Sequence, residues 1–244
     1  MLIQSLNQTW LENIIQSLNM VFHSEAHFQF CLAWEIKKHF NCNVILEDYT
    51  ACVKDPNGKI IQKLYTDIVV EDTKSNYRIG IEVKYKTAEL TYNNVHLFNH
   101  GALPLGRYDY LWDINRLESI IYNKPLFINS NKCTMNFKTF NVAYAIILTN
   151  DRKYWEKSQF CYLTNIDSAF RIHDGNNLTG LLNWNSQSAQ SPKIVVDTRR
   201  AHSIDLRGNY TCHWKPYLSL NIPKGEFRLM ITEIHKKKNN LSKT

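Results

Sequence analysis

The sequence lacks the features that mark a membrane or secreted protein. None of its apolar runs approaches the roughly 18 residues that a helix needs to cross a membrane. The first residues, from Met1 to Asn7, have neither the basic region nor the apolar stretch of a signal peptide. We therefore expect an intracellular, cytoplasmic protein.

Signatures of common cofactors are also missing. No two of the six cysteines form a Cys-x-x-Cys pair, so neither a zinc module nor a disulfide framework is indicated, and we expect buried free thiols. The chain has no glycine-rich phosphate loop, dinucleotide fingerprint or serine-hydrolase elbow. The sequence therefore does not indicate an activity that depends on a bound nucleotide.

The composition is that of a globular protein. With 244 residues and 44% hydrophobic content the chain can bury a real core, and we expect a single domain over residues 1–244. Its core would cover about residues 24–150, and a C-terminal extension about residues 151–238. The formal net charge of +7 favours a polyanionic partner, although part of it lies in the tail from His235 to Thr244.

The stretch from Leu64 to Lys86 predicts a β-hairpin. β-branched and aromatic residues fill both arms, whereas the residues between them, from Glu71 to Asn76, are polar or charged. Asp67 interrupts the otherwise apolar first arm. A carboxylate in the middle of a strand is costly to bury unless it is paired or binds a cation.

The second arm adds two ionisable groups. Because side chains alternate along a strand, Glu82 and Lys84 share one face with Gly80 and Lys86, so they converge with Asp67. Two carboxylates with an ammonium beside them suit a divalent-metal site with a lysine next to the bound water. An edge hairpin whose charged face is simply solvated is the alternative.

The tripeptide pattern acidic-x-Lys has little specificity by itself. It occurs at Glu35–Lys37, Asp72–Lys74, Glu82–Lys84 and Asp151–Lys153. Of these, the first falls in a helical pattern, the second in the turn and the last after an apolar run. Only Glu82–Lys84 lies within a predicted strand.

The elements around the hairpin follow from periodicity and capping. We expect helices over Leu6–Val21, Ser24–Phe40 and Arg107–Tyr122, and strands over Asn43–Val53 and Asn141–Thr149. The stretch between Thr87 and Leu105 reads as irregular. The last third of the chain is turn-rich. We expect a short helix over Arg152–Lys157, an extended segment over Phe160–Thr164 and a final strand from Glu226 to His235, which extends the sheet or packs the C-terminal part against it.

This arrangement resembles the restriction-endonuclease-like, or PD-(D/E)xK, nucleases. Asp67 matches the first half of their signature and Glu82-Val83-Lys84 the second, although Thr66 stands where the signature has proline. The resemblance implies an α/β fold whose core runs helix, three strands, helix, strand. A mixed central sheet would be flanked by helices, with an additional N-terminal helix and a β-rich C-terminal extension.

The resemblance also implies an activity, the Mg²⁺-dependent hydrolysis of DNA phosphodiester bonds, in which Mn²⁺ would substitute. Asp67, Glu82 and the main-chain oxygen of Val83 would hold the metal, and Lys84 would orient or deprotonate the attacking water. Glu25 would be an auxiliary ligand, unless it is only an acidic residue favoured in the first turn of a helix. The alternatives are a non-catalytic DNA-binding or assembly protein of the same fold and a nuclease acting on RNA. A place in microbial or phage defence or in DNA processing is what the resemblance suggests.

Candidate nucleic-acid contacts lie on both sides of the hairpin. They are Gln29, Lys86, His100, Arg199 and Arg200, the last two from a stretch that interleaves cations with Tyr210, Trp214 and Tyr217. The alternative for this stretch is that its aromatic rings pack on the sheet. Asp113 and Arg116 read as a structural ion pair at three-residue spacing. DNA is the expected partner, and a homodimer is left open.

Overall fold

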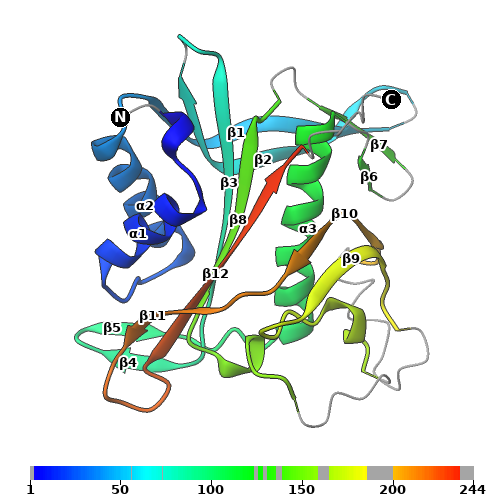
Figure 1. Cartoon of the computed structure of the whole chain (residues 1–244). Coiled ribbons are helices and arrows are strands. Elements are labelled where there is room, and N and C mark those ends of the chain that lie inside the picture. Colours follow the sequence, from blue (N-terminus) through cyan, green and yellow to red (C-terminus); the bar gives the residue numbers. More distant parts are fainter. Residues whose placement is uncertain are drawn as a thin grey trace, which may run out of the picture.

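The computed structural model describes residues 3–55, 57–72, 74–123, 126–128, 131–135, 139–158, 165–185 and 200–236 (Figure 1). Its framework is a mixed sheet covered by helices on both faces. Helices α1 (Gln8–Leu18) and α2 (Glu25–His39) lie on one face, and α3 (Leu103–Tyr122) lies on the other. The predicted α/β class is therefore confirmed.

The central sheet has eight strands in the order β11-β12-β8-β3-β2-β1-β7-β6. Their bounds are β1 (Asn43–Lys54), β2 (Ile60–Asp72), β3 (Tyr77–Lys86), β6 (Leu126–Ile128), β7 (Asn131–Met135), β8 (Val142–Thr149), β11 (Lys215–Ser219) and β12 (Glu226–His235). The pairing of β3 with β8 is parallel, and the other pairings described in this sheet are antiparallel. A parallel neighbour needs a long crossover, and α3 lies in the chain between these two strands.

The predicted order of elements is present as α2, β1, β2, β3, α3 and β8. Two short hairpins interrupt it. One is β6–β7, and the other, β4 (Leu90–Tyr92) with β5 (Val95–Leu97), lies in the stretch that we expected to be irregular. Helix α3 begins at Leu103, before the predicted Arg107, because Pro104 fits the first turn of a helix, where a missing N–H costs nothing.

The other boundaries shift by a few residues. The N-terminal helix is shorter than predicted and is preceded by a 3₁₀ turn at Ile3–Ser5, and β2 extends back to Ile60. A 3₁₀ turn at Arg152–Tyr154 replaces the short helix that we expected there. The predicted extended segment from Phe160 to Thr164 lies outside the described residues.

Two hydrophobic cores lie on the two faces of the sheet. Ile79, Ile81 and Val83 of β3 pack toward α1 and α2, whereas Ala143 and Ala145 of β8 are in the core that contains α3. Every residue of β8 is buried, as its continuous apolar run predicted. The face of β3 that carries Gly80, Glu82 and Lys84 is therefore turned toward α3.

The C-terminal part completes the sheet and covers α3. Strand β12 pairs along the whole of β8, which confirms that the last predicted strand extends the sheet. The ribbon β9 (Asn177–Leu182) with β10 (Ile204–Thr211) lies beside α3 (Figure 1). Cys31, Cys42, Cys52 and Cys212 are free thiols, and no described helix is long and apolar enough to cross a membrane.

Candidate active site

The site forms where β2 and β3 separate. Their pairing runs from Asp72↔Tyr77 to Ile68↔Ile81, and beyond this point β3 continues beside β8 alone. A strand that loses its neighbour leaves backbone N–H groups that need other acceptors. Asp67 Oδ2 accepts a hydrogen bond from the N–H of Val83 (2.7 Å), and Glu25 Oε2 accepts one from the N–H of Tyr85 (2.8 Å).

This fork brings Glu25 to the same strand edge as Asp67. The two N–H groups are two residues apart on β3, so the two carboxylates lie about 7 Å apart along the strand. Ser24 caps α2 by accepting a hydrogen bond from the N–H of His27 (3.1 Å), which starts the helix where Glu25 can reach β3. The structure therefore places Glu25 beside the second strand of the hairpin.

Gln29 lies behind Asp67 and supports it. Its Nε2 donates to the main-chain oxygen of Asp67 (2.6 Å) and to Oε1 of Glu47 (3.0 Å). Glu47 is in β1 with a φ of 52°, a left-handed conformation that is uncommon for glutamate. Gln29 is 9% exposed and its amide is already bonded within the protein, and its contact with nucleic acid stays a prediction.

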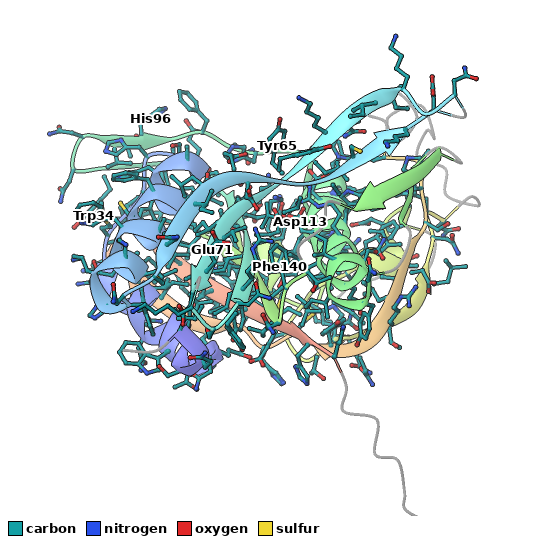
Figure 2. All side chains as sticks on the ribbon, turned by 90° about the horizontal axis from the view of Figure 1, so that it is seen from above. Trp34, Tyr65, Glu71, His96, Asp113 and Phe140 are labelled. Atoms are coloured by element: carbon teal, nitrogen blue, oxygen red, sulfur yellow. The ribbon has the colours of Figure 1, made fainter. Side chains whose placement is uncertain are left out.

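Helix α3 supplies the partners of the other two predicted residues. Lys84 Nζ lies 2.6 Å from Oδ2 of Asp113, and the guanidinium of Arg116 is in direct contact with Oε1 of Glu82. Arg116 also lies 3.6 Å from Asp113. Asp113 is a buried residue of α3, and Figure 2 shows it near the middle of the view.

The predicted ion pair between Asp113 and Arg116 is confirmed, and each of the two also binds a residue of the hairpin, which the prediction did not include. A signal was present in the sequence. Asp113 falls on the buried stripe that also carries Tyr110, Ile114 and Leu117, just as Asp67 interrupts an apolar strand. What the sequence could not show is which strand this stripe faces.

Burial dominates the electrostatics of the carboxylates. Burial raises the pKa of Asp67 to about 6; the Lys84 ammonium acts against this shift and the Asp113 carboxylate adds to it. Burial likewise raises the pKa of Glu82, whose side chain is 2% exposed, and Arg116 opposes the shift. The charges of the five residues act on one another, so they form one cluster.

Burial acts in the opposite direction on the two cations. It would lower the pKa of Lys84 and of Arg116, but the surrounding carboxylates outweigh it and raise both pKa values. Asp113 is the main carboxylate for Lys84, and Glu82 is the main one for Arg116. Lys84 is therefore protonated at neutral pH.

The donor set fits a divalent cation. When all of them are ionised, Asp67, Glu82 and Asp113 carry three negative charges against the two positive charges of Lys84 and Arg116. Within the described residues no three His, Cys, Asp or Glu side chains group closely enough to hold a metal. The predicted set of ligands has two carboxylates and one carbonyl oxygen, so it contains fewer acidic side chains than such a group. Its donors are all oxygen atoms, which Mg²⁺ prefers. The carbonyl oxygen of Val83 accepts a hydrogen bond from Lys84 Nζ (3.2 Å), so this oxygen lies within the cluster.

Lys86 and His100 lie beside Glu25. Lys86 Nζ is 4.0 Å from Oε2 of Glu25, and the charges of Lys86 and Glu25 both act on His100. His100 Nδ1 accepts from the N–H of Thr87 (3.1 Å), and burial, with Lys86, lowers the pKa of its imidazole. These two predicted nucleic-acid contacts are therefore at the Glu25 end of the site.

The other predicted contacts are elsewhere. Arg200 pairs with Asp109 (2.5 Å from Nε to Oδ1), and Arg199 lies outside the described residues. Trp214 and Tyr217 are buried in the two cores on opposite faces of the sheet. These two rings pack on the sheet, which was the alternative to a surface of interleaved cations and aromatic rings.

We compared the chain with protein-family models, with curated proteins and with solved structures. None of the three comparisons found a match. The likeness to restriction-endonuclease-like nucleases therefore depends on the hairpin residues and on the order of elements around them, and it stays a hypothesis about the family of this chain.

Proposed function

We propose that this protein is a Mg²⁺-dependent nuclease of the restriction-endonuclease-like kind that hydrolyses DNA phosphodiester bonds in the cytoplasm. One observation carries the proposal. Asp67, Glu82 and Lys84, from two strands, meet where β2 and β3 separate, in a cluster with Asp113 and Arg116 of α3. A role in microbial or phage defence or in DNA processing belongs to the same proposal.

In this reaction Asp67, Glu82 and the main-chain oxygen of Val83 would hold the metal. A bound Mg²⁺ supplies charge neutralisation at the phosphate and a more acidic water. Mn²⁺ is expected to substitute, since it accepts the same oxygen donors. Glu25 accepts from the N–H of Tyr85 through Oε2, two residues beyond Val83 on β3. Its other carboxylate oxygen, Oε1, would position a water molecule.

Lys84 has two candidate roles, as a base that deprotonates the water or as a cation that orients it and stabilises charge on the phosphate. The raised pKa of its ammonium favours the cation, because a lysine must lose its proton before it can act as a base. A cation fixed beside the scissile phosphate stabilises the charge that develops in the transition state. We therefore assign the electrostatic role to Lys84.

The rival proposals are a DNA-binding protein that does not cleave and a nuclease for RNA. A binder has no use for buried carboxylates that repel phosphate, which argues against the first. Cleavage assays with DNA, RNA and a small phosphodiester, each with Mg²⁺ and with EDTA, test all three. Metal-dependent cleavage of DNA is the expected result, and cleavage of RNA alone would favour the second rival.

We expect the protein to bind DNA when Ca²⁺ replaces Mg²⁺, with an affinity that falls steeply as salt increases. The net charge of +7 and the Lys86 ammonium at the site favour phosphate contacts, and each contact releases counterions. Fluorescence anisotropy of labelled DNA between low and high salt measures the slope. A flat salt dependence would contradict the nucleic-acid proposal.

Glu25→Gln is expected to reduce cleavage less than changes at Asp67 or Lys84. The amide oxygen of glutamine can still accept from the N–H of Tyr85, so the strand edge is kept and only the charge is lost. We expect a loss of about ten- to a hundredfold, measured as single-turnover cleavage rate. Glu12→Gln, at an exposed ion pair with Lys215, is the matched control and should cleave normally.

A further inference from the structure

Arg116 has a place in the site that the proposed function does not explain. Its guanidinium contacts Glu82, the most deeply buried carboxylate of the cluster, while Lys84 is held by Asp113. The Nη2 of Arg116 also donates to the main-chain oxygen of Tyr65 (3.3 Å). The side chain of Tyr65 is exposed on β2 (Figure 2), so the guanidinium lies between a buried carboxylate and a strand that reaches the surface.

Arg116 and a metal ion would compete for the same group. Glu82 cannot stay ionised at 2% exposure without a positive partner, and Arg116 is the partner that contacts it. A divalent cation held by Asp67 and Glu82 would lie within a few ångströms of the guanidinium, where two positive charges repel each other strongly because burial keeps water out. The two cations are therefore alternatives at Glu82.

We propose that Arg116 is a further active-site residue that neutralises Glu82 in the metal-free protein and is released to bind the substrate phosphate when a divalent cation takes Glu82. This inference rests on the proposed function, because it assumes the metal site at Asp67 and Glu82. The planar fork of a guanidinium matches the oxygens of a phosphate, and a short rotation from Glu82 toward Tyr65 keeps it at the fork of the strands.

The test measures Ca²⁺ binding by calorimetry for the wild type and for Arg116→Met, without DNA. The variant is expected to bind Ca²⁺ about tenfold more tightly, because the competing cation is gone, and to have a lower Tm without metal. With Ca²⁺ present, its affinity for DNA is expected to fall about tenfold, because one phosphate contact is lost.

Arg107→Met is the matched control. Arg107 is on the same helix and makes a buried ion pair with Asp167 (2.5 Å), away from the point where β2 and β3 separate. Its loss should lower the Tm as well but leave Ca²⁺ affinity unchanged. The comparison therefore separates competition for Glu82 from the general cost of breaking a buried ion pair on α3.

Ca²⁺ affinity that is unchanged or weaker in Arg116→Met would overturn the inference while leaving the proposed function intact. If neither protein binds Ca²⁺ or Mn²⁺, the proposed function fails and this inference fails with it. If Arg116→Met does not fold, a crystal structure of the wild type with Mn²⁺ decides. The contact between Arg116 and Glu82 should then be broken, and its persistence beside bound Mn²⁺ would overturn the inference.

Discussion

Lys84→Ala is expected to reduce Mg²⁺-dependent DNA cleavage about a thousandfold or more, while DNA binding with Ca²⁺ is nearly unchanged. A fixed ammonium acts mainly on the charge of the transition state, so its removal lowers the rate of the chemical step more than the affinity. Single-turnover cleavage rates and anisotropy measure the two quantities separately.

The chain contains its own control for this variant. Glu35-Ile36-Lys37 has the same spacing as Glu82-Val83-Lys84, but it lies at the end of α2, where Lys37 donates to the main-chain oxygen of Cys42 (2.5 Å). Lys37→Ala should therefore cleave almost normally. If the Lys84 and Lys37 variants cleave equally well, the assigned site is wrong.

The structure adds a cost that this experiment must allow for. Removing Lys84 leaves Asp113 buried with only Arg116, 3.6 Å away, and the loss of one partner from a buried ion pair costs about 3–5 kcal/mol. The double variant Lys84→Ala with Asp113→Asn removes the unpaired charge and should recover most of this stability. Its cleavage should remain lost, which separates chemistry from folding.

Asp67→Asn is expected to abolish cleavage and, at neutral pH, to stabilise the metal-free protein. Burial raises the pKa of Asp67 to about 6 from an ordinary 3.8, so between these values the folded chain binds more protons than the unfolded chain. Stability contributed by this group is therefore present below pH 4 and is lost as the pH rises to about 6. Asparagine does not titrate, and its oxygen can still accept from the N–H of Val83.

The free energy of unfolding, measured by denaturant titration without metal at pH 4 and at pH 8, tests this sign. The variant should lie within about 1 kcal/mol of the wild type at pH 4 and exceed it by about 3 kcal/mol at pH 8, because the pKa of Asp67 is raised from 3.8 to about 6. Asp72→Asn is the control. The hydroxyl of Ser75 holds the pKa of Asp72 below its ordinary value, so its stabilisation is lost as the pH falls, with the opposite sign. An Asp67→Asn advantage that is equal at both pH values would contradict the assignment.

Much of the candidate site could be predicted because it depends on local pattern. Alternation along β3 alone puts Glu82 and Lys84 on one face, and Ser24 before an apolar stripe predicts the start of α2 and hence the place of Glu25. The role of Gln29 could not be predicted. It depends on the separation of β2 from β3 beyond Ile68, and the alternation of side chains along a strand does not predict where two strands separate.

The sequence by itself determined the helices, the hairpin, the buried strand β8 and the shared face of Asp67, Glu82 and Lys84. These features come from backbone geometry and solvation over a few residues. Only the tertiary structure decided that Arg116 meets Glu82, 34 positions away, that Asp113 meets Lys84, and that Trp214 and Tyr217 pack on opposite faces. The physical reason is that a helix carries its charges to whichever strand the sheet order and the crossover place beneath it, and that order is set by the packing of the whole chain.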